Sequence, residues 1–182
     1  MKKNIFPLTL IALGAALIAV ASQISFPIGT VPITLQTLAV GLIASIYKIR
    51  ETFLTMLLYL LLGVIGLPVF SGGAGGFAIL YGPTGGFLLA FLISGTLISV
   101  LLSLFKKGLV SLAIANSLAV LLTLFIGTIW LKIFANMSWS SAFLAGFIPF
   151  VAGEILKVIV IILITRALLR ILPRVNNYFK SE

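Results

Sequence analysis

Hydrophobic residues follow one another in six long runs, and polar residues are concentrated in the gaps between them. The runs cover residues 6–25, 33–47, 52–67, 84–105, 109–134 and 142–172. A helix needs about 20 predominantly apolar residues to cross the hydrocarbon core of a bilayer. The pattern therefore predicts an all-α integral membrane protein: a six-transmembrane-helix bundle that forms one domain over residues 1–182.

The second and third runs are short for a membrane span, because each has only about 15 residues. We expect their outer ends to stop below the membrane surface and to leave a cavity there. Irregular backbone at that depth is tolerated only where it is buried in protein or lines a cavity. The Gly-rich stretch 68–83 follows the third run. It is predicted to be an outer loop between helices 3 and 4 that covers this cavity, and the alternative is a flexible loop without a role.

Composition excludes most soluble functions. Hydrophobic residues make up 62% of the chain and charged residues 8%, whereas a soluble domain carries about 25% charged residues. Cys and His are absent, which removes thiolate chemistry and the commonest metal ligand and general base. There is no G-x-x-x-x-G-K-[ST] motif for an ATP site of its own, and no hydrolase motif. We therefore expect neither an enzyme nor a metal site nor a bound cofactor.

The net charge of +9 comes from cations that lie mainly between the apolar runs. With the N-terminus inside, the inner side holds ten of them, and the outer side holds Lys132. The ten are Lys2, Lys3, Lys48, Arg50, Lys106, Lys107, Arg166, Arg170, Arg174 and Lys180. Positive charge accumulates on the cytoplasmic side of membrane proteins. This bias predicts a multi-pass protein of the cell membrane with both termini in the cytoplasm, and it explains the charge without nucleic acid.

The first apolar run allows two interpretations. Residues 19–21 (AVA) precede Ser22 and resemble the cleavage site of a signal peptide, and cleavage would leave five spans. We favour a retained helix because further spans follow at once.

The same run carries Ala12, Ala15, Ala16 and Ala19, which form two overlapping A-x-x-x-A pairs. Small residues four apart allow close approach of another helix, either within this bundle or from a partner protein.

Two charges interrupt the last apolar run. Glu154 and Lys157 are three residues apart, so they share a helix face and can partly neutralise each other. Charged residues inside a span are costly and usually mark a ligand or ion path, although a structural ion pair is the alternative. Pro149 suits the first turn of a helix. A helix that begins there places both charges in the outer half of the membrane.

Further polar and aromatic residues extend this candidate site. Thr34, Gln36 and Thr37 lie where the second run enters from outside, and the amide of Gln36 suits an amide-like or ureido ligand. Gln23, Asn116 and Thr84 are additional candidates, although each alone is more often an interhelical hydrogen bond. Aromatic walls are expected from Phe70, Phe77 and Tyr81.

Four segments together resemble the BioY family, the biotin-specific substrate-binding components of energy-coupling-factor transporters. They are 31–37 (VPITLQT), 59–70 (YLLLGVIGLPVF), 81–87 (YGPTGGF) and 149–157 (PFVAGEILK). The resemblance covers nearly the whole chain. The family usually has Asp at the position of Glu154, and the extra methylene moves the carboxylate.

The resemblance implies a six-helix subunit that captures biotin from outside. It implies partners as well: a transmembrane coupling protein, which would dock on the alanines of the first helix, and two cytoplasmic ATPases. Glu154, Gln36, Thr34 or Asn116 could meet the ureido ring of biotin, and Lys157 its carboxylate. Glu154 and Lys157 could also act as one unit on the ureido group. Phe70, Phe77 and Tyr81 would provide apolar walls, and Gly73 and Thr84 complete the candidate set.

Two other functions remain possible from the sequence. The same scaffold could be specific for another vitamin, or the chain could be a stand-alone ion-coupled carrier. The carrier is weakened because no clear repeat relates the first three spans to the last three.

Overall fold

The computed structural model describes residues 5–105 and 107–171, which form a helical bundle with a two-stranded sheet at one end. The helices are α1 (Ile5–Gln23), α2 (Gln36–Ile46), α3 (Ile49–Val64), α4 (Phe77–Tyr81), α5 (Gly85–Leu104), α6 (Leu109–Phe134), α7 (Trp139–Gly146) and α8 (Ile148–Ile171). A 3-10 turn, η1, covers Ser71–Gly73. Strands β1 (Ser25–Phe26) and β2 (Ile33–Thr34) pair antiparallel, with Ser25 opposite Thr34.

Among the described residues, four helical segments are long and apolar enough to cross a membrane: α1, α5, α6 and the combined segment Trp139–Ile171. Helix α2 is apolar but has 11 residues, and α3 has 16. The chain is therefore all-helical with several spans, as predicted, but the count of six transmembrane helices is not confirmed. Helices α2 and α3 correspond to the second and third apolar runs, which the sequence already identifies as short for a membrane span.

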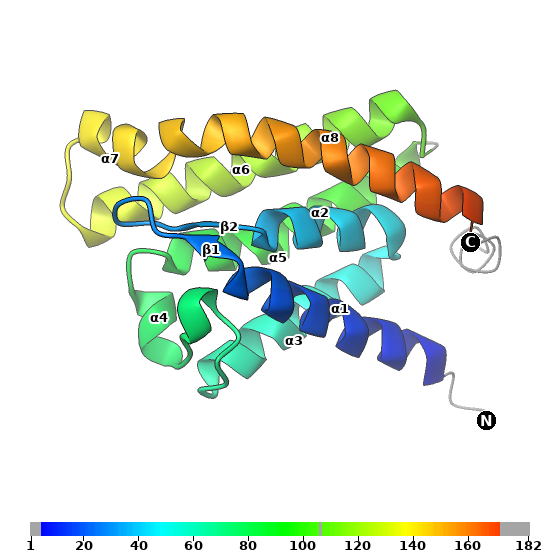
Figure 1. The fold of residues 1–182 in the computed structure, drawn as a ribbon, viewed down its shortest axis with the longest axis horizontal. Coiled ribbons are helices and arrows are strands. Elements are labelled where there is room, and N and C mark those ends of the chain that lie inside the picture. The colour runs from blue at the N-terminus through cyan, green and yellow to red at the C-terminus, as the bar shows by residue number, and fades with distance from the viewer. Residues whose placement is uncertain (1–4, 106, 172–182) are drawn as a thin grey trace.

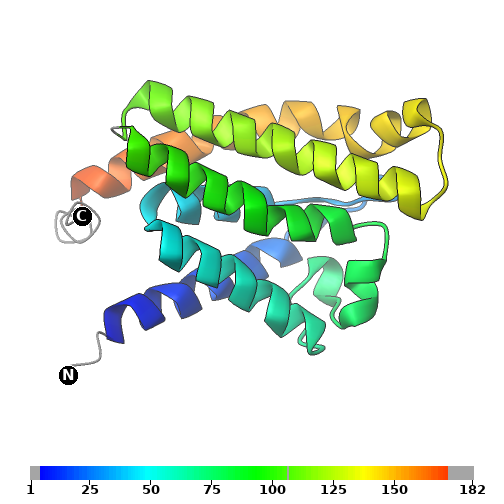
Figure 2. The same cartoon turned by 180° about the vertical axis from the view of Figure 1, so that it is seen from behind.

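The bundle has α6 and α8 on one side, α1 and α3 on the other, and α2 and α5 between them (Figure 1). The view from behind shows the same order (Figure 2). Strands β1 and β2, α4 and α7 gather at one end, whereas the first turn of α1 and the last turn of α8 lie at the opposite end. Both ends of the described chain thus share one side of the bundle.

The second helix begins later than predicted. Residues 33 and 34 belong to β2, and α2 starts at Gln36, part-way along the bundle (Figure 1). Non-helical backbone therefore reaches into the bundle beside the N-terminal half of α8. Its position supports the expectation of a cavity at this depth, because such backbone must be surrounded by protein or line a cavity.

The last predicted span is divided. Phe147 leaves the helical conformation, with φ −123° and ψ −64°, and separates α7 from α8. Helix α8 begins at Ile148, so Pro149 occupies its first turn, where a missing N–H costs no helical hydrogen bond. This start confirms the place that the sequence indicated for Pro149.

The Gly-rich stretch is more ordered than an outer loop. It contains η1 and the short helix α4, and Gly72, Gly73 and Gly76 adopt positive φ angles that favour glycine. The last residues of α1 form hydrogen bonds with the first residues of this stretch. Ser22 Oγ donates to the carbonyl of Val69 at 2.7 Å, and Gln23 Nε2 donates to the carbonyl of Phe70 at 3.3 Å. The segment is thus tied to the bundle near its first residues.

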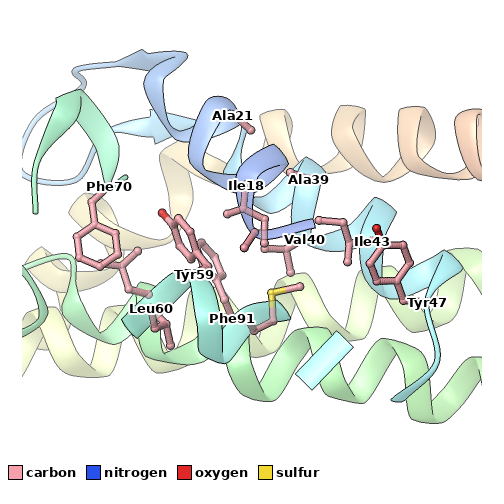
Figure 3. Packing of buried hydrophobic residues seen from close by; sticks show 13 residues of the cluster. Ile18, Ala21, Ala39, Val40, Ile43, Tyr47, Tyr59, Leu60, Phe70 and Phe91 are labelled. Carbon is pink, nitrogen blue, oxygen red and sulfur yellow. The ribbon is translucent and has the colours of Figure 1, made fainter. Parts of the chain in front are cut away.

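The main hydrophobic core lies between α1, α2, α3 and α5 (Figure 3). Tyr59 and Phe70 are fully buried and pack edge to face, with ring centroids 5.6 Å apart. Figure 3 places them at one end of the cluster, with Tyr47 at the other. Because Phe70 closes one end of this core, the core and the Gly-rich stretch are parts of one packing unit.

Candidate ligand-binding site

A cavity of about 240 Å³ lies between β2, the Gly-rich stretch and helices α2, α5, α6 and α8. Its volume is slightly below the roughly 300–1,000 Å³ of common ligand pockets, which suits a small molecule. The lining consists of Val31, Pro32, Thr34, Gln36, Thr37, Phe70, Ser71, Ala74, Ile79, Thr84, Phe87, Leu88, Phe91, Thr123, Leu124, Phe150, Glu154 and Lys157. A mostly apolar wall with a few convergent polar groups is typical of small-molecule sites.

Lys157 is the centre of a hydrogen-bonded network in the cavity wall. Its Nζ donates to Glu154 Oε1 at 2.6 Å, to Thr37 Oγ1 at 2.9 Å and to the carbonyl oxygen of Thr34 at 2.8 Å. An ammonium group has three N–H donors, so all of them are engaged. The start of α2 and one face of α8 are thereby joined by a buried cation, which is only 7% exposed.

Glu154 retains a free acceptor. Its Oε1 accepts hydrogen bonds from Lys157 and from Thr37 Oγ1, the latter at 2.8 Å. Its Oε2 is buried and has no hydrogen-bond partner among the described residues. Leaving a buried acceptor unpaired costs about 1–3 kcal/mol, and more for a charged group. The site therefore favours a ligand that brings a hydrogen-bond donor to this oxygen.

Gln36 is held in place by its neighbours on both sides. Thr34 Oγ1 donates to Gln36 Oε1 at 2.8 Å, and Gln36 Nε2 donates to the hydroxyl of Tyr59. That hydroxyl in turn donates to the carbonyl of Val69 at 3.0 Å. The amide nitrogen has a second N–H, which can serve a ligand because Gln36 lines the cavity.

Tyr59 was not anticipated as part of the site. It does not line the cavity, but it connects Gln36 to the backbone before Phe70. A signal was present in the sequence, because a tyrosine in an otherwise apolar helix needs a partner for its hydroxyl when it is buried. That signal does not identify the partner.

Four phenylalanines form aromatic walls: Phe70, Phe87, Phe91 and Phe150. The rings of Phe87 and Phe150 lie 6.1 Å apart. Of the four, Phe70 alone was predicted. The others lie inside apolar runs, where the sequence does not distinguish a side chain that faces a cavity from one that faces lipid.

The structure brings six of the ten predicted ligand-binding residues together: Thr34, Gln36, Phe70, Thr84, Glu154 and Lys157. The other four, Asn116, Gly73, Phe77 and Tyr81, do not line the cavity.

Asn116 lies in α6 and is bonded within the bundle. Its Nδ2 donates to Ser45 Oγ at 3.0 Å and to the carbonyl of Leu112 at 2.9 Å. Asn116 therefore makes an interhelical contact and does not line the cavity, and a role towards a ligand stays a prediction.

The aromatic residues of α4 face away from the cavity. Phe77 and Tyr81 are 64% and 70% exposed, and their rings are 6.5 Å apart. They stand four residues apart, so they share one helix face, whereas Ile79 between them lines the cavity. Gly73 belongs to the exposed turn η1, outside the lining. The expected aromatic walls from α4 are thus replaced by one isoleucine.

The alanines of α1 divide into two pairs. Ala15 is buried in the core and Ala19 packs against it, whereas Ala12 and Ala16 are exposed. Ala15 and Ala19 thus pack within the bundle, as one interpretation of the stripe expects. Ala12 and Ala16 are exposed, and their role in docking a partner helix stays a prediction.

Comparisons with known proteins agree with one another. The family model described as the BioY family matches residues 1–174. The "Biotin transporter BioY2" of Lactococcus lactis subsp. cremoris is 57% identical over 178 residues, which are 98% of each chain. The "Biotin transporter BioY" of Thermotoga maritima is 36% identical over 149 residues, 82% of this chain and 87% of that one.

A solved structure matches the fold. It is the crystal structure of the S-component for biotin from an ECF-type ABC transporter, with a TM-score of 0.84 and 29% sequence identity. The match covers 93% of this chain and 95% of the other. With the family model matching nearly the whole length, these findings lead to one conclusion: the chain belongs to the BioY family.

Proposed function

We propose that this protein is the substrate-binding component for biotin of an ATP-driven energy-coupling-factor importer. The observation that carries the proposal is the buried Glu154–Lys157 pair on the wall of a cavity of suitable size, in a chain of this family. A transport subunit captures its ligand without changing it, in accord with the absence of catalytic motifs. We treat residues 1–182 as one transmembrane substrate-binding domain.

The ureido ring of biotin fits the groups that the network leaves open. It presents two N–H donors and one carbonyl acceptor. Glu154 Oε2 would accept from one N–H, and the second N–H of Gln36 would donate to the carbonyl. The phenylalanine walls would hold the fused rings, since apolar surface is released from water on binding.

The partners follow from the family and from what the chain lacks. Import driven by ATP requires an ATP site, and this sequence has no phosphate-binding loop. We propose a transmembrane coupling protein and two cytoplasmic ATPases as partners. The exposed Ala12–Ala16 pair is the proposed docking surface for the coupling protein, because small residues let a second helix come close.

We propose that both termini are cytoplasmic and that β1, β2, α4 and α7 face outward. The starts of α3 and α6 and the end of α8 lie at the same end of the bundle as the start of α1. These places carry Lys48, Arg50, Lys107, Arg166 and Arg170. Five further cations used in the prediction, Lys2, Lys3, Lys106, Arg174 and Lys180, lie outside the described residues. The positive charge supports an inner side at this end.

Equilibrium binding of labelled biotin to the purified chain, prepared from cells grown without biotin, tests the proposal. We expect saturable one-to-one binding that thiamine and riboflavin do not displace. Displacement by another vitamin would indicate that the protein binds that vitamin instead of biotin. If the folded protein did not bind biotin at all, the substrate assignment would be wrong. Uptake in cells that lack any coupling ATPase would indicate an ion-coupled carrier instead.

A further inference from the structure

Phe77 and Tyr81 are the most exposed aromatic side chains among the described residues, and both lie on α4. Their rings are 6.5 Å apart on one face of this helix, whereas Ile79 on the other face lines the cavity. An exposed apolar patch usually marks an interaction site. The ligand cavity does not use this face, so its partner lies outside the cavity.

The length of α3 places α4 within the thickness of the membrane. Helix α3 begins between Lys48 and Arg50, and its 16 residues extend about 24 Å, whereas the hydrocarbon core is about 30 Å thick. The exposed side chains of Phe53, Leu61 and Ile65 share one face and continue past the last residue of α3. The lipid therefore extends beyond α3, to the level where α4 packs beside its end (Figure 1).

Helix α5 gives the same level independently. Its 20 residues extend about 30 Å and end shortly before Lys107, on the side of the cations. Gly85, its first residue, therefore lies at the opposite boundary of the hydrocarbon core. Tyr81 precedes Gly85 by four residues, so α4 lies at the boundary between acyl chains and headgroups.

We infer that the face of α4 formed by Phe77 and Tyr81 binds membrane lipid, at the boundary between the acyl chains and the headgroups. A tyrosine suits this level because its ring is apolar and its hydroxyl can reach the headgroups and water. The inference goes beyond the proposed function. It assigns a partner to the outer face of a helix whose inner face borders the ligand cavity.

The size and the charge of this face favour lipid over a protein partner. Two aromatic side chains that are about two-thirds exposed offer about 200–330 Å², whereas a stable protein interface buries about 800 Å² on each side. The whole stretch 68–83 has no charged residue that could pair with a partner protein. Contact with lipid has no such minimum area and needs no charge.

The backbone holds α4 at both of its ends. The N–H of Gly76 donates to the carbonyl of Gly63 in α3 at 2.7 Å. At the other end, Trp130 Nε1 in α6 donates to the carbonyl of Gly82 at 2.9 Å. These bonds keep the aromatic face turned to the lipid while Ile79 is turned to the cavity.

The depth of α4 in a bilayer tests the inference. The chain has no cysteine, so a single nitroxide label can be placed at Ala78→Cys, an exposed position of α4 that leaves both aromatic residues intact. Leu61→Cys is the reference in lipid. Ser140→Cys is the reference in water, because α6 extends about 39 Å and carries the start of α7 beyond the hydrocarbon core.

Collision rates of each label with oxygen and with a water-soluble nickel chelate measure its depth in phosphatidylcholine vesicles. We expect the label at residue 78 to lie about 5–10 Å below the headgroup surface, as in other interfacial helices. A label as accessible to nickel as the one at residue 140 would overturn the inference. Spin–spin broadening between labels at residue 78 would also overturn it, because a second copy of the chain would then cover this face.

The double variant Phe77→Ser, Tyr81→Ser tests whether the aromatic side chains hold α4 at this depth. We expect the label at residue 78 to shift towards the value for residue 140, and an unchanged depth would overturn the inference. Phe26→Ser, which changes an exposed aromatic residue of β1, is the matched control and should not shift the label. The label at residue 61 verifies that the double variant stays inserted. None of these depths requires biotin, so a failure to bind biotin would count against the proposed function alone.

Discussion

The two ends of α2 carry similar polar residues with different surroundings. At its start, Gln36 and Thr37 line the cavity and belong to the network of Glu154 and Lys157. Near its end, Ser45 accepts a hydrogen bond from Asn116 in a part of the bundle surrounded by apolar residues of α5 and α6. Both regions are buried, and both keep one acceptor without a partner among the described residues: Glu154 Oε2 and Asn116 Oδ1.

The difference between the two ends is the space next to the free acceptor. Asn116 Oδ1 lies against Gly41, where an added Cβ would come within 2.9 Å of it. Glu154, in contrast, lines the cavity, and its side chain is charged. A polar side chain within the membrane therefore indicates a binding site only where a cavity adjoins it. Variants at the cavity and at the far end of α2 test this distinction.

Glu154→Gln should have the largest effect on binding. The change keeps the size of the side chain but removes the counter-charge of Lys157 and weakens the acceptor offered to the ureido group. Breaking the buried ion pair lowers stability, and the ligand also loses a hydrogen bond to a charged acceptor, which is worth about 1.5–3 kcal/mol. We therefore expect biotin affinity to fall by about ten- to a hundredfold. Equilibrium binding on protein of verified fold measures it. Unchanged affinity would place the ligand elsewhere.

Tyr59→Phe should weaken biotin binding by about fivefold. The Tyr59 hydroxyl accepts a hydrogen bond from Gln36 Nε2 and donates one to the carbonyl of Val69. A hydrogen bond of this kind contributes about 1 kcal/mol. Tyr47→Phe is the matched control, because Tyr47 is also buried but lies at the far end of the core in Figure 3. Equal affinities of the two variants would show that Tyr59 does not position Gln36.

Gly127→Ala and Gly41→Ala compare crowding at the two places. An added Cβ at Gly127 would overlap the ring of Phe87, which lines the cavity, whereas at Gly41 it would overlap Ile161. Overpacking costs about 1–3 kcal/mol of stability in either case. We expect Gly127→Ala alone to weaken biotin binding, by several-fold. Melting temperatures measure the loss of stability in both variants, and equilibrium binding measures the affinity for biotin. An equal fall in affinity for the two variants would contradict this prediction.

Asn116→Leu should change affinity by less than about threefold. The leucine removes the unpaired Oδ1, but it also takes the hydrogen bond away from Ser45, which is fully buried. We expect a loss of stability of about 1–3 kcal/mol, because one partner of the bond remains buried without the other. A tenfold loss of biotin affinity would return Asn116 to the site and remove the contrast between the two ends of α2.

The smallest effect concerns pH and the C-terminal end of α2. Lys107 Nζ donates to the carbonyl of Ile46 at 3.1 Å, and burial lowers the pKa of Lys107 to about 8. Its ordinary pKa is 10.5. Since the folded state releases this proton first, stability should rise with pH between about 8 and 10.5. Melting curves should show this rise in the unmodified protein and a smaller one in Lys107→Gln, with biotin affinity unchanged.

Much of the site was accessible from the sequence because charge in a membrane span is rare. Glu154, Lys157 and Gln36 stand out against apolar neighbours, and all three line the cavity. Asn116 stands out in the same way, but the structure places it in an interhelical contact. The sequence reports that a polar group is in the membrane, but not on which side of its helix the cavity lies.

Local sequence is sufficient to identify this chain as a membrane protein, to locate its long helices and to show which residues carry charge within them. These properties are local, because hydropathy over about 20 residues decides whether a helix can span. Tertiary structure alone decided that α2 starts part-way along the bundle, that Phe77 and Tyr81 face away from the cavity, and that Lys157 has no free donor. These depend on contacts between residues more than a hundred positions apart, such as Thr34 and Lys157, which no local pattern records.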